Sequence, residues 1–306
     1  MNILVLFSYG SLTTLDDVSA FYQDIYHGKA TDEVINKATK NYESLGVPDS
    51  LGANTKRIGR ALIKRLAVET GETWEVFIAN HHSRPSIETI AEQCAKLNPK
   101  KVATFGLTPF HSVTGNVAYA KKFSRIFRTT NESTELVHIK PFCENEAFIR
   151  VMIDRAKTAY NWLPEKMRED TEIIFVAHSM PGLPKVHEKM IKQYQTLARK
   201  IAAGVGIEAY HIAYRSRNPK HRWLGPDVLD VINQLNARKV PAVIFIEVLS
   251  VVENLEAIQE VTRDAVDKAR EYGIKAVQTE FLNDSTDFVE ALGDHIWECL
   301  SPEIQA

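Results

Sequence analysis

Short apolar runs alternate with longer amphipathic segments along the whole chain, and this alternation constrains the fold more than any other feature of the sequence. The apolar runs have the length of strands, and the segments between them have the three-to-four-residue spacing of helices. Such alternation is typical of parallel sheets with helices on both faces. The predicted strands are Ile3–Phe7, Glu75–Ala79, Val102–Leu107, Leu136–Ile139, Ile173–Ala177, Ala209–Ala213, Val243–Val248 and Ala276–Gln278. The predicted helices include Thr55–Thr70, Ser86–Leu97, Glu146–Tyr160, Lys185–Ala203, Gly225–Ala237, Leu255–Tyr272 and Asp287–Leu300.

The pattern restarts near Ile173, after a break at Asn161–Glu165. We therefore predict an α/β fold with two Rossmann-like halves, residues 1–145 and 146–306, each a parallel sheet flanked by helices, with an active-site cleft between them. The C-terminal helix fits either half. Because ligands of open parallel sheets bind beyond the carboxyl ends of the strands, we expect the chemistry in the loops that follow the strands and in the cleft.

Composition and charge exclude several classes of protein. The 306 residues are 44% hydrophobic and 25% charged, and 37 Lys and Arg against 39 Asp and Glu leave no basic surplus for nucleic acid. No stretch approaches the roughly 20 apolar residues of a membrane span, and residues 1–7 are typical of a buried strand rather than a signal peptide. Cys94, Cys143 and Cys299 form no CxxC pair, which argues against a disulfide framework, a zinc knuckle or an iron–sulfur cluster. We expect a cytoplasmic location.

Two predicted strand ends carry groups suited to catalysis. In Ser8-Tyr9-Gly10-Ser11, the glycine allows a sharp turn that leaves Tyr9 facing the ligand edge, although such a tyrosine is more often a packing residue. After a strongly apolar strand comes His178, whose imidazole is suited to proton transfer near neutrality. A hydrogen-bonded histidine with no chemical role fits the same position equally well. No Gly-x-Ser-x-Gly motif surrounds Ser179, which disfavours a hydrolase triad.

Two further loops are chemically unusual. Glu253, Glu256 and Glu260 stand at i, i+3 and i+7, which predicts three carboxylates on one helix face. Stacked like charges cost about 0.2–0.5 kcal/mol per pair, so a bound cation is one explanation and a solvated acidic face near a helix N-terminus is the other. The segment 223–228, Trp-Leu-Gly-Pro-Asp-Val, indicates a turn that opens a helix, and Trp223 is suited to wall a pocket for a flat ligand.

Several motifs occur in a defined order along the chain. The most specific are Ala177-His178-Ser179-Met180-Pro181, Trp223-Leu224-Gly225-Pro226-Asp227-Val228 and Leu255-Glu256. The weaker ones are Tyr9-Gly10, Tyr22…Gly28, Tyr42-Glu43…Gly46, His82…Pro85…Ile87, Leu107…Pro109…Ser112 and Tyr119…Lys121. As a set, they resemble the ferrochelatase family, and most of all the soluble coproporphyrin ferrochelatases, over essentially the whole chain.

The resemblance implies an enzyme that inserts Fe²⁺ into a porphyrin in haem biosynthesis, a reaction that removes two pyrrole protons. It implies that His178 and Glu256 face each other across the cleft, with His178 accepting a proton or contacting the metal and Glu256 binding iron or relaying protons. The implied metal set is His178, Glu256, Glu253 and Glu260. Tyr9 would contact the iron from the opposite face. The implied porphyrin contacts are Tyr9, Tyr26, His27, Ser50, Tyr119 and Trp223. Iron is then a substrate, and no tightly bound cofactor is expected.

Some positions depart from the family pattern. Tyr26 and His27 stand where arginines usually meet the porphyrin carboxylates, and Asp49-Ser50-Leu51 replaces Ser-Pro-Leu. Arginine forks suit carboxylates best, so the porphyrin is less constrained by the sequence than the chemical centre is. The residues that could compensate are Arg57, Arg215, Arg217 and His27.

Near the acidic segment, Glu253-Asn254 replaces an Asp-His pair, which keeps the carboxylate. Glu247 and Leu249 replace the usual Pro and Gly. The segment 30–37 corresponds to an apolar lip in membrane-bound relatives but is mostly polar here, so we expect coproporphyrin III rather than protoporphyrin IX.

Other functions stay open on this evidence. The same site could remove iron from haem, or the protein could be a non-catalytic haem or porphyrin carrier in which Tyr9 ligates ferric iron. The Trp-Leu-Gly-Pro-Asp-Val turn and the acidic segment argue against a corrinoid or sirohaem chelatase. Carboxylate and imidazole ligands also accept zinc or cobalt. The expected partners are a porphyrin or haem and a haem or iron handover protein, with no nucleic acid and no membrane span.

Overall fold

The structure, a computed structural model, describes residues 1–45, 50–218 and 222–301. Gly46 and Asp49, which belong to the motifs compared with the family pattern, lie outside the described residues. The chain divides into two compact units. Unit 1 comprises Met1–Leu107, Ser112–Pro141 and Asn283–Ala306, and unit 2 comprises Thr108–His111 and Phe142–Leu282. The C-terminal helix, which the sequence left free to join either half, therefore belongs to unit 1, whereas the expected division into 1–145 and 146–306 placed it in the second half.

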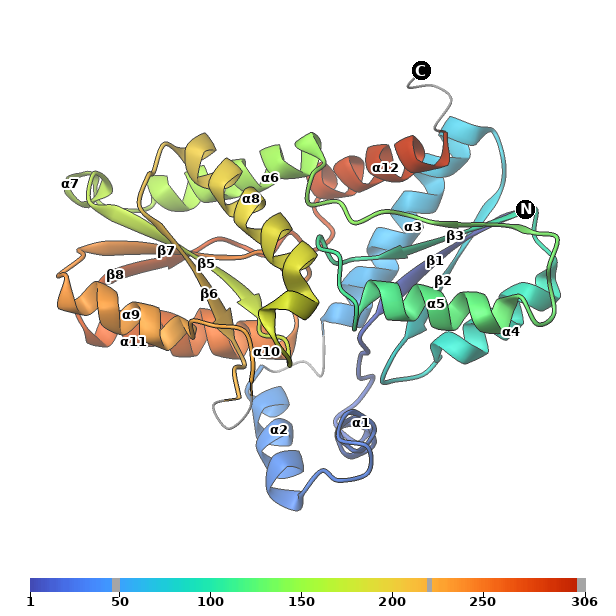
Figure 1. The fold of residues 1–306 in the computed structure, drawn as a ribbon, viewed down its shortest axis with the longest axis horizontal. Coiled ribbons are helices and arrows are strands. Elements are labelled where there is room, and N and C mark those ends of the chain that lie inside the picture. The colour runs from blue at the N-terminus through green and yellow to red at the C-terminus, as the bar shows by residue number, and fades with distance from the viewer. Residues whose placement is uncertain (46–49, 219–221, 302–306) are drawn as a thin grey trace. The chain divides into compact units, whose positions relative to one another are not determined.

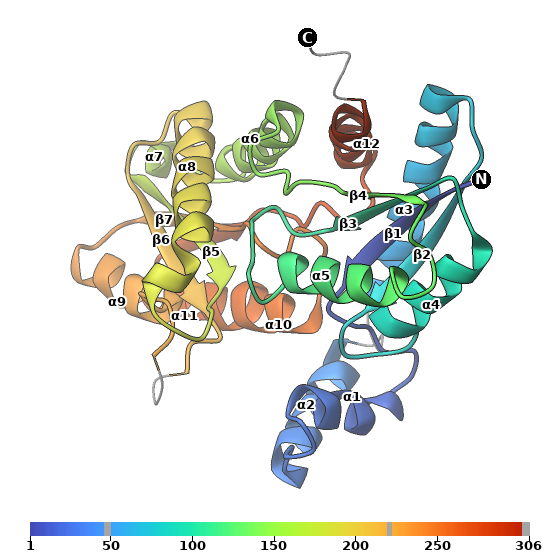
Figure 2. The ribbon, with the colours of Figure 1, turned by 45° about the vertical axis from the view of Figure 1, so that its right-hand side comes forward.

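Unit 1 is built on four parallel strands in the order β2-β1-β3-β4. Their bounds are β1 Asn2–Ser8, β2 Trp74–Asn80, β3 Lys101–Gly106 and β4 Glu135–His138. The helices are α1 Asp17–Ile25, α2 Asp32–Leu45, α3 Leu51–Thr70, α4 Ile87–Leu97, α5 Asn116–Phe127 and α12 Thr286–Leu300. Helices α4 and α5 cover one face of the sheet, and α3 covers the other, with α12 packed on α3 (Figures 1 and 2). Because both faces are covered, β1 is buried along its whole length.

Unit 2 repeats this plan with the strand order β6-β5-β7-β8, again all parallel. The strand bounds are β5 Thr171–His178, β6 Tyr210–Arg215, β7 Ala242–Glu247 and β8 Lys275–Gln278. The main α-helices are α6 Glu146–Asn161, α8 Glu188–Val205, α9 Val228–Ala237 and α11 Val266–Glu271. The remaining helical elements are α7 Glu165–Arg168, η1 Pro184–His187, α10 Leu255–Ala257 and η2 Ile258–Ala265. Helices α6 and α8 lie on one face, and α9, η2 and α11 lie on the other (Figure 1).

The α/β fold and all eight predicted strands are confirmed. One helix start differs because of a capping side chain. The predicted helix Gly225–Ala237 begins at Val228, because the Asp227 carboxylate accepts a hydrogen bond from the Leu229 N–H and ends the preceding turn. The predicted helix Leu255–Tyr272 is one continuous helical segment, but its middle, η2, is a π-helix.

Each sheet has a point at which the strand order reverses. In unit 1 the chain leaves β1 for β2 on one side and later returns to β3 on the other, and in unit 2 β5 lies between β6 and β7 in the same way. Ligands of open α/β sheets bind outside the carboxyl ends of strands at such points. Tyr9 follows β1 and His178 ends β5, so each unit carries a predicted site residue at its reversal point.

No helix in the described part of the chain combines the length and the hydrophobicity that a membrane span requires.

Candidate active site

Three ionisable side chains end neighbouring strands of unit 2. His178 is the last residue of β5, Arg215 the last of β6 and Glu247 the last of β7. His178 and Arg215 are register partners in the parallel ladder. Because parallel strands end at the same edge of a sheet, these groups meet at the reversal point of this unit.

The imidazole of His178 has one fixed nitrogen and one nitrogen facing an acid. Its Nδ1 lies 2.5 Å from the carbonyl oxygen of Ser179, and because a carbonyl can only accept, Nδ1 carries the hydrogen. Its Nε2 lies 3.5 Å from Oε2 of Glu256. When the imidazole is neutral, His178 Nε2 and the carboxylate oxygen of Glu256 both carry an available lone pair. The gap between these two atoms therefore favours a proton or a metal cation. The structure thus brings the predicted pair together.

The loop after His178 is held by the Trp-Leu-Gly-Pro-Asp-Val turn. The hydroxyl of buried Ser179 donates to the carbonyl oxygen of Leu224 at 2.7 Å, and the Leu224 N–H donates to the Met180 carbonyl at 3.2 Å. The ring centroid of Trp223 lies 6.3 Å from that of His178. The two most specific motifs are therefore parts of one structure in which Trp223 walls the side of the imidazole.

Glu256 stands at the start of a capped helix. The Asn254 side chain accepts a hydrogen bond from the Ala257 N–H at 3.0 Å, and the helix begins at Leu255. The prediction that Glu253 shares this helix face is wrong, because the chain enters the helix only after Asn254. Beyond Ala257 the helix becomes π-helical, with wider turns that place residues four or five apart on one side, so Glu256 and Glu260 share a face.

Arg215 lies among three carboxylates. Its side chain is 2% exposed, its Nε lies 2.9 Å from Oε2 of Glu247, and its Nη1 lies 3.1 Å from Glu260 and 3.7 Å from Glu256. Although burial acts to lower the pKa of Arg215, the three carboxylates raise it, so the guanidinium is a permanent cation. Its Nη2 donates to the hydroxyl of Ser250 at 2.9 Å.

The same charges act on Glu256. Desolvation by the surrounding protein acts to raise the pKa of Glu256, but the hydrogen bond and charge of His178 and the charge of Arg215 outweigh it and lower that pKa to about 2. Its side chain is about half exposed, at 49%. Glu256 is therefore an anion at neutral pH that is open to solvent on one side.

The predicted metal set does not assemble as a set. Across residues 1–45, 50–218 and 222–301, no group of three or more His, Cys, Asp or Glu side chains is arranged to hold a metal ion. Oε2 of Glu260 instead accepts hydrogen bonds from Arg215 and from the Ser216 hydroxyl. Of the four predicted ligands, His178 and Glu256 are therefore the pair that faces a common gap.

Unit 1 places Tyr9 in a cluster of rings. The Tyr9 side chain is 46% exposed, and its ring meets His82 at a centroid distance of 4.6 Å and Phe21 at 6.3 Å. Gly10 has φ +147°, and a Cβ there would lie 2.6 Å from the Phe21 ring, so the turn after Tyr9 requires glycine. His82 Nδ1 lies 2.6 Å from Oδ2 of Asp24.

The other predicted porphyrin contacts in unit 1 are scattered around this cluster. Tyr119 is partly buried between Phe7 and His81, and burial raises the pKa of its hydroxyl. Tyr26, at the end of α1, is 45% exposed and stacks on Tyr22. His27 follows with φ +52°, and Ser50 immediately precedes α3.

The three arginines that could compensate for the arginines missing at positions 26 and 27 already have acidic partners. Arg57 pairs with Asp284, Arg215 with the glutamates described above, and Arg217 lies 4.0 Å from Asp230. The sequence reading missed the pairing of Arg215 with Glu247. The sequence signal was a charge at the end of each of two apolar strands, which calls for an opposite charge but does not identify the partner, because β5 lies between β6 and β7.

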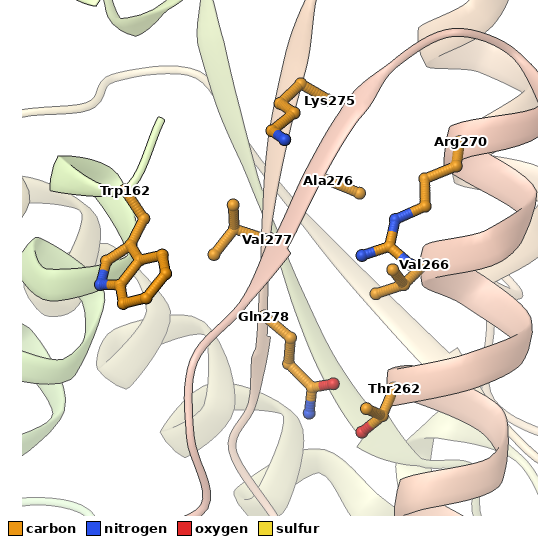
Figure 3. Close-up of a pocket in the computed structure, with 8 residues that line it drawn as sticks. All are labelled: Trp162, Thr262, Val266, Arg270, Lys275, Ala276, Val277 and Gln278. Carbon is orange, nitrogen blue, oxygen red and sulfur yellow. The ribbon is translucent and has the colours of Figure 1, made fainter. Parts of the chain in front are cut away.

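A separate pocket of about 370 Å³ borders the edge strand β8 of unit 2 (Figure 3). Val277 points toward Trp162 on one side, and Ala276 points to the side of Arg270 (Figure 3). Its lining residues are Trp162, Thr262, Val266, Arg270, Lys275, Ala276, Val277 and Gln278. These eight residues carry no carboxylate, imidazole or thiol.

Known proteins were compared with this chain. The family model described as Ferrochelatase matches residues 4–300. A ferrochelatase of Herpetosiphon aurantiacus is 26% identical over 94% of this chain and 96% of its own length. A coproporphyrin III ferrochelatase of Oceanobacillus iheyensis is 25% identical over 99% of this chain and 98% of its own length.

Among solved structures, SirB from Bacillus subtilis with Fe³⁺ matches with a TM-score of 0.64 and 13% identity, covering 99% of this chain and 98% of that one. At this identity the match shows a common chelatase fold. The family model shows more, because it spans nearly the whole chain. The chain belongs to the ferrochelatase family of enzymes.

Proposed function

We propose that this protein inserts Fe²⁺ into a porphyrin, with His178 as the proton acceptor and Glu256 as an anionic ligand of the incoming metal. The observation that carries the proposal is the 3.5 Å separation of His178 Nε2 and Glu256 Oε2, two bases that face each other at the reversal point of the sheet. An ion about 2.1 Å from each atom would span this gap with an angle close to tetrahedral.

The charges assign different roles to the two groups. Because the pKa of Glu256 is about 2, its carboxylate attracts a cation at neutral pH but is a poor proton acceptor. His178 has Nδ1–H committed to the Ser179 carbonyl, which leaves Nε2 as its one basic atom. Nε2 would contact the metal or take a pyrrole proton, one at a time, and would take the proton once the metal has left it for the ring. The imidazolium so formed would be stabilised by Glu256 and would lose its proton to solvent along the exposed side of that carboxylate. Fe²⁺ enters and two protons leave, so charge is conserved.

We further propose that the substrate is coproporphyrin III rather than protoporphyrin IX. The residues of α2 are mostly polar, and all except Ala38 and Tyr42 are partly or fully exposed. Several relatives are named coproporphyrin III ferrochelatase. A cytoplasmic location belongs to the same proposal, since all three cysteines are free. The placement of Tyr9 on the opposite face of the ring stays a prediction.

Anaerobic Fe²⁺ insertion into both porphyrins tests the proposal. His178→Ala and Glu256→Gln should each lower kcat by about 10²–10⁴-fold, the range of a lost proton acceptor or of a lost charge in the transition state. The matched control is His211→Ala, because His211 pairs with Glu172 at 2.5 Å at the amino ends of β6 and β5, where no ligand is expected. It should leave kcat within about twofold of wild type.

Fe²⁺ insertion by the His178→Ala variant at the wild-type rate would refute the role of His178. Faster insertion into protoporphyrin IX would refute the substrate assignment. Because Tyr26 and His27 replace the usual arginines, the same assay includes haem with a ferrous chelator. If metal-free porphyrin fluorescence appears with haem and the chelator while no Fe²⁺ is inserted into either porphyrin, the function is iron removal instead.

A further inference from the structure

We propose that Arg215 is a specificity-determining residue that keeps Glu260 away from the metal, so that the incoming ion meets only His178 and Glu256. The inference rests on the proposed function, because it concerns the metal that this site would take up. It assigns Arg215 a positioning role, since its guanidinium would act through the carboxylates and not through contact with the porphyrin or the iron.

The first step is the anchoring of the guanidinium. Glu247 holds Nε at 2.9 Å and Ser250 holds Nη2 at 2.9 Å, and both partners follow or end β7. Glu247 is itself fixed, because its Oε1 accepts hydrogen bonds from the Leu249 and Ser250 N–H groups at 3.0 and 2.9 Å. With two nitrogens committed to this side, Nη1 is presented to the π-helix.

The second step is the capture of Glu260. Its Oε2 lies 3.1 Å from Nη1 of Arg215 and also accepts a hydrogen bond from the hydroxyl of Ser216. Ser216 has φ +58°, a conformation that serine rarely adopts. Arg215, the last residue of β6, and Ser216, the next residue, therefore hold the same oxygen. Glu256 and Glu260 share a helix face that would otherwise present both to one cation.

The consequence is a site with two metal ligands in place of three. A fixed monocation at 3.7 Å from Glu256 also weakens the attraction of that carboxylate for a divalent ion. Weak binding suits a metal that must leave the protein for the porphyrin. Removing Arg215 and Glu247 together removes one positive and one negative charge, so the net charge of the cluster is kept while Glu260 is released.

Cobalt binding without porphyrin tests the inference independently of catalysis. Co²⁺ is titrated by calorimetry and by its visible absorption, which reports imidazole and carboxylate ligation. The double variant Arg215→Gln/Glu247→Gln should bind Co²⁺ at least about tenfold more tightly than wild type, because one more carboxylate can reach the ion. Adding Glu260→Gln should remove most of that gain and leave only the part that comes from the lost cation near Glu256. With Fe²⁺, the double variant should lower KM for the metal and also lower kcat, because release into the ring becomes slower.

A merely structural role for Arg215 would weaken folding but would not tighten cobalt binding. The inference is overturned if the double variant binds Co²⁺ no more tightly, or if the whole gain persists with Glu260→Gln. If the double variant does not fold, single variants decide, because Glu260→Gln alone should leave cobalt affinity unchanged whereas Glu256→Gln should lose it. Failure of iron insertion by the wild type would refute the proposed function. The cobalt titrations would still decide whether Arg215 keeps Glu260 away from a bound metal ion.

Discussion

His81 and His82 are neighbours in sequence with different surroundings. His82 hydrogen-bonds to Asp24, whereas the ring of His81 lies 4.1 Å from that of His82 and 4.7 Å from that of Tyr119. Nδ1 of His81 is buried and has no hydrogen-bond partner among the described residues. Burial first, and then the charges of His82 and Lys122, lower the pKa of His81 to about 4.

This shift makes stability depend on pH. The unfolded chain protonates His81 below about pH 6.5, but the folded chain does so only below about pH 4, so stability falls as the pH drops through this window and is not lost further below it. At pH 5 the loss should be about 2 kcal/mol. Urea unfolding of wild type and His81→Phe at pH 7 and pH 5 measures it, and the variant should lose less between the two values. Equal losses would show that His81 is protonated in the folded protein.

The individual residues of the site were predicted from the sequence only in part. His178 and Glu256 were found because their motifs are specific, and the structure places them together. The Arg215–Glu247 pair was not found, because pairing across β6 and β7 depends on the order of strands in the sheet, which separates these two strands by β5. Local sequence does not contain that order.

At the scale of elements, the helix that carries Glu256 depends on one cap. Asn254 is extended, with φ −146°, and satisfies the Ala257 N–H. Glu256 is two residues further on, so a frayed first turn would move its carboxylate away from His178. Asn254 stands where the family usually has histidine, and it keeps the helix start defined.

Asn254→Ala should lower the free energy of unfolding by about 1 kcal/mol, because it removes a helix cap. It should also lower kcat for metal insertion several-fold, since Glu256 loses its fixed position, while Asn254→Asp, which keeps the capping oxygen, should retain both properties. Chemical denaturation and the insertion assay on the same samples check this. A loss of stability with unchanged kcat would show that the cap does not position Glu256.

Strands were easier to predict than this helix. The strands β1, β5 and β7 are buried runs rich in apolar residues, and their length is that of a strand rather than of a helix. The π-helix η2 was predicted as an ordinary helix, because a change from i→i+4 to i→i+5 bonding leaves the amphipathic pattern nearly the same.

At the scale of the molecule, each unit has its own core, and α12 completes that of unit 1. Phe288, Leu292 and Ile296 of α12 are fully buried, and Arg65 of α3 forms ion pairs with Glu290 and Asp294. The sequence could not assign α12, because an amphipathic helix of this kind fits any apolar sheet or helix face, and only the packing on α3 decides it.

Leu292→Ala should destabilise unit 1 by about 2–5 kcal/mol, the usual cost of a cavity at a fully buried leucine. Each unit has two tryptophans, so paired Trp→Phe backgrounds report each unit alone. The reporters are Trp74 and Trp297 in unit 1 and Trp162 and Trp223 in unit 2. The unit 1 reporters should shift more than those of unit 2, and the matched variant Leu235→Ala should show the reverse. Identical shifts of all reporters would contradict separate cores.

The hydrogen bond from His178 Nδ1 to the Ser179 carbonyl limits how the imidazole can work. A histidine that is free to exchange tautomers can receive a proton at one nitrogen and pass it on from the other. Here Nε2 alone must both accept and release the proton. The two pyrrole protons of one macrocycle would then leave one after the other, and His178 must release the first to water before it can accept the second.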